Sequence, residues 1–136
     1  MPDATFEILE HTADVGFRAT GASEAELFAN AAWALLSFTE GSEGDSQERS
    51  LEIHGEDRES LMINWLSELL YLFDSGEFVP SRISVREISP DRLVARLGGA
   101  PRRIAAWRLI VKAVTYHLIE VKESGGRWEA TVYLDV

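Results

Sequence analysis

Residues 57–76 read DRESLMINWLSELLYLFDSG, a stretch with helical spacing whose apolar residues cover most of the helix circumference. Asp57 or Ser60 can cap its beginning, and Asp74-Ser75-Gly76 is a typical helix end. The apolar positions are Leu61, Ile63, Trp65, Leu66, Leu69, Leu70 and Phe73. A helix with such a broad apolar surface is stable only when other elements cover it. The pattern therefore predicts a well-buried helix.

A second helix and several strands are predicted around this stretch. Ser23 and Glu26 form a capping-box pattern before apolar residues at helical spacing, which predicts a helix over about residues 24–38. Alternation of apolar and polar residues predicts strands. The strand segments are residues 6–10, 15–20, 51–53, 83–88, 93–97, 112–121 and 128–136.

The segments between these elements complete the predicted architecture. Residues 89–91 and 124–127 are typical of turns, and residues 40–48 of a solvated acidic loop. We expect residues 98–101, which read GGAP, to end a strand, whereas residues 104–111 fit a helix or a strand equally. The sum is an α+β fold with two main helices packed on a mostly antiparallel mixed sheet. We expect one domain over residues 1–136.

Composition narrows the classes of function. The 136 residues are 46% hydrophobic, which is enough for the core of one globular domain, and none is cysteine. The lack of cysteine excludes disulfides, thiolate nucleophiles and zinc–thiolate sites. No window reaches the ~18 apolar residues of a membrane span, and we expect a cytoplasmic protein without membrane contact. The net charge of −10 would repel a phosphate backbone, so strong direct nucleic-acid binding is not expected.

Acidic residues stand near both ends of the chain. The string His11-Thr12-Ala13-Asp14-Val15-Gly16 separates the first two predicted strands, and the last strand ends at Leu134-Asp135-Val136. If the two ends meet, Asp14, Asp135 and the terminal carboxylate gather, and a divalent cation would compensate their charge. In the alternative interpretation, Asp14 accepts hydrogen bonds from turn amides and Asp135 is a solvated strand end.

Other catalytic patterns are weak or missing in the sequence. His11, His54 and His117 are widely separated and lack the spacing of a zinc site. The sequence contains no Gly-x-Ser-x-Gly elbow and no Gly-rich phosphate loop. The strand segment 112–117 is either an ordinary half-buried strand or a polar patch close to the acidic ends.

Five segments of the sequence resemble the archease family, in the family's order and over nearly the whole chain. They are residues 10–16 (EHTADVG), 26–32 (ELFANAA), 65–74 (WLSELLYLFD), 112–117 (KAVTYH) and 128–136 (WEATVYLDV). The resemblance implies a mixed sheet with helices and a small protein cofactor that is not an enzyme. Archeases assist the GTP-dependent RNA ligase of tRNA splicing and RNA repair, by promoting its guanylylation and its multiple turnover.

The resemblance also implies a metal site. The family's ligands correspond to Asp14, Asp135 and Val136, the last through main-chain or terminal oxygens. The implied ion is calcium, with magnesium or manganese as alternatives. His11, Lys112 and His117 are candidate partner-facing polar residues. No partner contact is carried over to residues 98–109, GGAPRRIAAWRL, because this stretch departs from the family's more polar pattern.

Two alternative functions remain open at this point. The first is an adaptor that modulates tRNA-modifying enzymes, such as a tRNA cytosine methyltransferase, which has been linked to the family. The second is a stand-alone metal-dependent hydrolase, with Asp14 and either His11 or His117 beside a bound ion. Turnover of a phosphoester by the isolated protein would favour the hydrolase.

Overall fold

The computed structural model describes residues 4–11 and 14–136, without the side chains of Glu10, His11 and Asp14. Within these residues the structure contains helices and strands in the following order. They are β1 (Phe6–His11), β2 (Asp14–Gly21), α1 (Glu24–Leu36), β3 (Gln47–His54), α2 (Arg58–Ser75), β4 (Val79–Ser89), β5 (Arg92–Ala100), β6 (Ala113–Ser124) and β7 (Arg127–Asp135).

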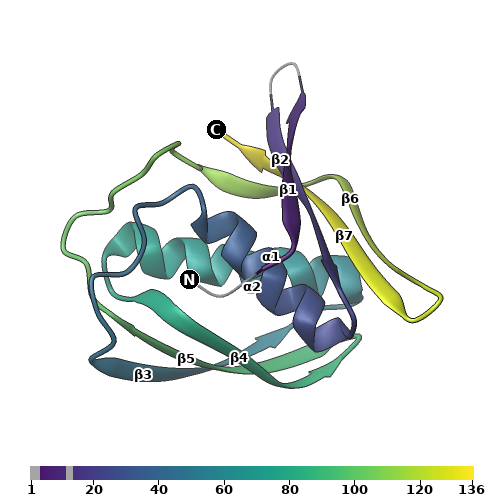
Figure 1. Ribbon diagram of the computed structural model, residues 1–136, viewed down its shortest axis with the longest axis horizontal. Helices are drawn as coiled ribbons and strands as arrows, with labels where there is room; N and C mark the ends of the chain where they lie inside the picture. Colours follow the sequence, from purple (N-terminus) through teal and green to yellow (C-terminus); the bar gives the residue numbers. More distant parts are fainter. Residues whose placement is uncertain (1–3, 12–13) are drawn as a thin grey trace.

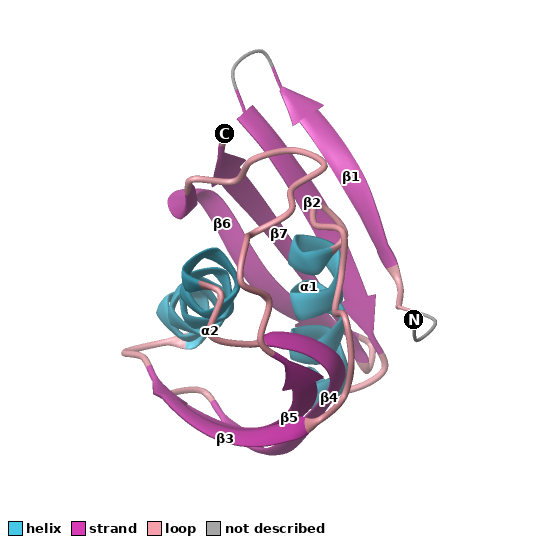
Figure 2. Cartoon of the chain, turned by 90° about the vertical axis from the view of Figure 1, so that its left-hand side faces the viewer, coloured by secondary structure: helices cyan, strands magenta, loops and turns pink. Residues whose placement is uncertain are grey.

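The strands form two sheets with the helices between them (Figure 2). One sheet has the order β1-β2-β7-β6 and the other β3-β5-β4, and every pairing between described strands is antiparallel. Helix α1 packs on β2 and β4, and α2 packs on β6 and β3. The predicted two helices and antiparallel pairing are confirmed, but the strands are divided between two sheets where one was expected.

The position of α2 between the sheets explains its apolar circumference. Trp65 is fully buried, and its indole Nε1 donates a hydrogen bond to the Phe28 carbonyl of α1 at 2.9 Å. The predicted caps are confirmed: Asp57 and Ser60 form a reciprocal capping box, and Gly76 ends the helix with φ at 77°. In the described part of the chain, neither helix is long and apolar enough to cross a membrane.

Helix α1 begins as predicted but ends earlier. Ser23 caps it by accepting a hydrogen bond from the Glu26 N–H at 3.1 Å. The Glu26 carboxylate accepts from the Ala22 N–H at 3.2 Å, one residue before the position of a capping box. Leu36 is the last helical residue, and residues 37–38 belong to the following turn. Neighbouring residues therefore predicted the start of the helix, whereas its end depends on the loop that follows.

Two loop predictions were wrong. Residues 98–100 continue β5 instead of ending it, because this strand lies in the middle of its sheet and pairs on both sides. Residues 104–111 form neither a helix nor a strand; a single bridge joins Trp107 to Thr39, and the Arg108 N–H donates to the Phe38 carbonyl at 2.8 Å. The acidic loop is also shorter than expected, since β3 begins at Gln47.

Strand β6 is irregular. Thr115 pairs with Tyr133 but Glu120 pairs with Thr131, so that residues 116–119 lie opposite Val132 alone. Leu118 has a positive φ of 57°, which is uncommon for a residue with a Cβ atom. The irregularity ends the predicted alternation after Thr115, and Tyr116 is exposed.

Gly99 is required where β5 pairs closely with the start of β4, opposite Pro80. A Cβ atom at this position would lie 2.1 Å from the Val79 carbonyl oxygen and 2.9 Å from the Pro80 Cα. We expect Gly99→Ala to cost about 1–3 kcal/mol of unfolding free energy, because backbone atoms must move apart. Urea unfolding measures this loss. Gly44→Ala is the matched control, since its nearest contact would be an ordinary 3.7 Å, and equal losses in both variants would contradict the prediction.

Candidate functional site

Four strand ends meet at one end of the four-stranded sheet. His11, the last residue of β1, pairs with Asp14, the first residue of β2. Val15 of β2 pairs with Leu134 of β7, so Asp14 and Asp135 follow on adjacent strands at the same end of this sheet. Figure 1 shows the C-terminus beside the start of β6 at this end. We call the group of Asp14, Asp135 and Val136 the acidic tip.

The alternation of β7 sets the direction of Asp135. Ala130, Val132 and Leu134 are fully buried on the face that packs on α1, so Asp135 lies on the opposite, exposed face as the sequence predicts. The carbonyl of Asp135 accepts a hydrogen bond from the Lys112 N–H at 2.7 Å. Val136 is half-buried and packs against the core. The last two residues are therefore held in place while the Asp135 carboxylate points to solvent.

The Asp135 carboxylate differs from the other described carboxylates of its sheet, which all have a partner. Among the residues that the structure describes, it has neither an ion pair nor a hydrogen bond. On the same sheet, Arg18 lies 2.7 Å from Glu7 and 3.7 Å from Glu129, and Lys122 also lies 3.7 Å from Glu129. Exposed carboxylates and main-chain oxygens are the ligands that hard divalent cations prefer. The chemistry of the acidic tip thus fits such an ion.

The described side chains do not complete a metal site by themselves. Among them, no three His, Asp or Glu residues lie close enough to hold an ion. The side chains of Asp14 and His11 lie outside the described residues, as do residues 12–13. The expected ligands from the first loop therefore stay a prediction, and the structure supplies the strand pairing that brings their backbone to the tip.

Tyr133 lies next to the acidic tip, and sequence reasoning assigned it no role. Its ring covers Gly16 on β2, where a Cβ atom would lie 2.7 Å from the Tyr133 Cδ1. The ring of His117 approaches Tyr133 edge-on, with 6.2 Å between the centroids. Lys112, just before β6, and His117, within β6, are both exposed. Both candidate partner-facing residues with described side chains are thus accessible near the tip.

His54 lies on the other sheet, apart from this cluster. Its Nε2 is 2.7 Å from the Glu52 carboxylate, which also lies 3.4 Å from Arg92. The hydrogen bond from Arg92, followed by that from His54, lowers the pKa of the Glu52 carboxyl below its usual value. Further along this sheet, beside Gly98, the carboxylate of Asp45 lies 2.7 Å from Arg82. Ion pairs therefore neutralise this face, and His54 does not assist chemistry at the tip.

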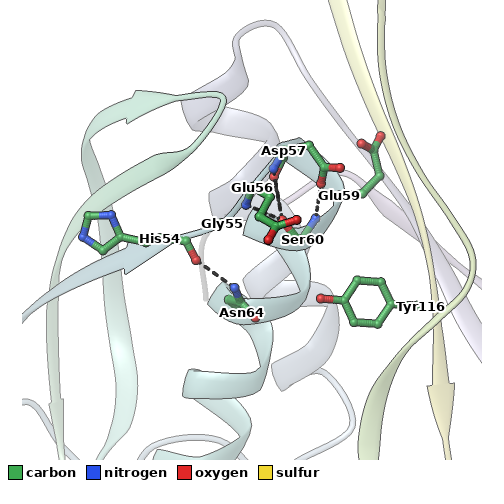
Figure 3. A pocket seen from close by; sticks show the side chains of 8 residues that line it. All are labelled: His54, Gly55, Glu56, Asp57, Glu59, Ser60, Asn64 and Tyr116. Atoms are coloured by element: carbon green, nitrogen blue, oxygen red, sulfur yellow. Dashed lines mark hydrogen bonds between the residues drawn. The ribbon is translucent and has the colours of Figure 1, made fainter.

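A cleft of about 650 Å³ lies at the beginning of α2 (Figure 3). Most of the polar groups drawn there already bond to one another. The Ser60 hydroxyl accepts from the Glu56 N–H at 2.7 Å, the Ser60 N–H donates to Asp57 at 2.8 Å, and Asn64 donates to the His54 carbonyl at 2.7 Å. Glu59 accepts from the Val121 N–H at 3.0 Å. These bonds cap α2 and join it to β3 and β6, which is a structural role.

Comparisons with known proteins point to one family. A model of the Archease protein family matches residues 6–136. The chain is 36% identical over 140 residues to Protein archease of Methanosarcina mazei, covering 96% of this chain and 95% of that protein. It is also 36% identical over 137 residues to Protein archease of Methanothermobacter thermautotrophicus, with coverages of 96% and 98%.

Two solved structures share the fold. The solution structure of protein 1598 of Methanobacterium thermoautotrophicum matches with a TM-score of 0.74 at 34% identity, covering 96% of this chain and 98% of that one. A crystal structure from Thermotoga maritima, described as an archease and possible chaperone, matches with a TM-score of 0.67 at 26% identity and covers 94% of both chains. Both matches extend over the two sheets and the helices between them.

Proposed function

Because the chain belongs to the archease family, we propose that it is a protein cofactor of a GTP-dependent RNA ligase of the tRNA-splicing and RNA-repair type. In this role it promotes guanylylation of the ligase and allows multiple turnover, without being an enzyme itself. The observation that carries the proposal is the exposed carboxylate of Asp135, held on a fixed strand end next to the start of β2.

The acidic tip is the proposed metal site. Asp14 and Asp135 would hold a divalent ion with their carboxylates, and Val136 with main-chain oxygens. Calcium fits these ligands, and magnesium or manganese are alternatives. A bound ion would supply positive charge at a surface that is otherwise acidic.

The residues around the tip have positioning and contact roles in this proposal. The Lys112 N–H fixes the Asp135 carbonyl, and the packing of Val136 holds the end of β7. Both constraints reduce the conformational entropy that the carboxylates would lose on binding. The side chains of Lys112 and His117, together with His11, are the proposed polar contacts to the ligase.

The proposal is tested with purified cognate ligase, GTP and Mn²⁺ or Mg²⁺, with and without this chain. We expect the chain to increase the rate of ligase guanylylation and to convert a single ligation turnover into many. Affinity capture from a cell extract separates this function from that of a tRNA-methyltransferase adaptor. Capture of the methyltransferase together with unchanged ligase guanylylation would contradict the proposal.

A further inference from the structure

Basic and acidic residues are segregated along this chain. Between Asp91 and Glu120 the sequence contains no Asp or Glu, although the net charge of the whole chain is −10. The same segment contains Arg92, Arg96, Arg102, Arg103, Arg108 and Lys112. We call its irregular part, residues 101–112, the basic loop. It includes the PRRIAAWRL stretch, which has no role in the proposed metal site.

The basic loop is fixed although it contains no helix or strand. The Trp107 ring packs edge-on against Phe73 with 4.7 Å between centroids. The Glu40 N–H donates to the Ala106 carbonyl at 2.9 Å, and Arg102 donates to the Gly41 carbonyl at 3.0 Å. Such anchoring means that the loop presents its outward side chains with little entropy left to lose on binding.

The outward side chains of the basic loop are aliphatic and cationic. Ile104 is 80% exposed and Ile110 is 61% exposed, values that are high for large apolar residues. The side chains of Arg103 and Lys112 are exposed and have no partner among the described residues, whereas Arg102 and Arg108 lie 3.6 Å from Glu43 and 3.8 Å from Glu40. Ile104 and Arg103 also line a recess of about 630 Å³ beside Pro101.

We propose that the basic loop is a docking surface for an acidic protein surface with apolar side chains at its centre. The inference rests on the proposed function, in which that partner is the ligase. The loop ends at Lys112, whose N–H binds the Asp135 carbonyl, so a partner that covers the acidic tip also meets the loop. The net negative charge of the chain repels an acidic partner, whereas the unpaired side chains of Arg103 and Lys112 attract it, and this difference orients the encounter.

The exposed side chains favour a protein over a phosphate-bearing partner. Isoleucine gains free energy when a partner's apolar atoms cover it, and a phosphate backbone offers few such atoms. The one aromatic ring of the loop, Trp107, packs on Phe73 instead of being free to stack on a base. An anionic membrane would meet the repulsion of the remaining acidic surface.

The charge part of this proposal is tested with Arg103→Glu and the matched control Arg86→Glu. Arg86 is exposed on β4 and also lacks a partner among the described residues, so the change in net charge is the same. Affinity for the cognate ligase is measured at low and high ionic strength by biolayer interferometry. We expect Arg103→Glu to weaken binding about tenfold at low salt and to flatten the salt dependence, and Arg86→Glu to change it less than about twofold.

The apolar part is tested with the double variant Ile104→Ser/Ile110→Ser against Tyr71→Ser, which removes a side chain that is 56% exposed on α2. We expect about tenfold weaker ligase binding for the double variant, with the salt dependence retained. If Arg103→Glu and the double variant both bind the ligase with wild-type affinity, while the wild-type chain stimulates guanylylation, the docking surface is overturned and the proposed function stands. Weaker binding to RNA or to anionic vesicles, with ligase binding unchanged, overturns the docking surface as well. A wild-type chain that neither binds nor stimulates the ligase overturns the proposed function and this inference together.

Discussion

Asp135→Asn is expected to remove most of the stimulation of ligase guanylylation while leaving the fold intact. The substitution keeps the size of the side chain and replaces an anionic carboxylate of the acidic tip by a neutral amide, which would hold a divalent cation more weakly. Asp135 is exposed, and its described contacts, the hydrogen bond from Lys112 and the pairing with Ala113, run through the main chain, which asparagine retains. We therefore expect at least a tenfold lower rate of stimulated guanylylation and an unchanged unfolding midpoint.

The matched control for this variant is Asp74→Asn. Asp74 is exposed near the end of α2 and has no ion pair with a described residue, so the variant changes the net charge by the same amount. Its stimulation should equal that of the wild type. Calcium titration of both variants by calorimetry reads the metal site independently of the ligase. Full stimulation by folded Asp135→Asn would contradict the role of the acidic tip.

The largest expected effect on stability is that of Trp65→Ala. Trp65 is fully buried between the helices, and its indole donates a hydrogen bond to the Phe28 carbonyl at 2.9 Å. Replacement by alanine removes the ring, leaves a cavity in a close-packed core and breaks this bond between α2 and α1. We expect a loss of about 3–5 kcal/mol of unfolding free energy.

Urea unfolding followed by far-ultraviolet circular dichroism measures this loss without relying on tryptophan fluorescence. Trp128→Ala is the control, since Trp128 is only half-buried and its ring faces the Arg58 guanidinium at 5.0 Å. Trp65→Phe should lie between the wild type and Trp65→Ala, because it refills part of the cavity. If Trp65→Ala lowered the unfolding free energy no more than Trp128→Ala does, the contact between α1 and α2 around Trp65 would not be the centre of the core.

Local signals predicted several elements of the fold closely. Asp57, Ser60 and Gly76 mark the ends of α2 because capping is a contact between residues a few positions apart. The alternation of β7 predicted the exposure of Asp135 for the same reason, since neighbouring side chains point to opposite faces. The turn at Gly125 and Gly126 is also local, because both residues adopt positive φ.

Other parts of the fold depend on contacts between distant segments. Gly98 and Gly99 looked like a strand end, but pairing of β5 with β3 and β4 outweighs their low strand propensity. The irregular path of residues 104–111 is decided by Phe38, Thr39 and Phe73, which lie far away in the sequence. The division of the strands into two sheets likewise follows from long-range pairing.

The sequence by itself determined the helices, most strands, the family and the candidate ligands, because caps, periodicity and motifs are properties of neighbouring residues. Only the tertiary structure decided that β2 lies beside β7, which brings the starts and ends of distant strands to one acidic tip. It also decided that the basic loop lies beside this tip, through the hydrogen bond from Lys112 to Asp135. Distant segments come together through packing and strand pairing. Because these contacts depend on both partners, the residue pattern of one segment alone does not predict them.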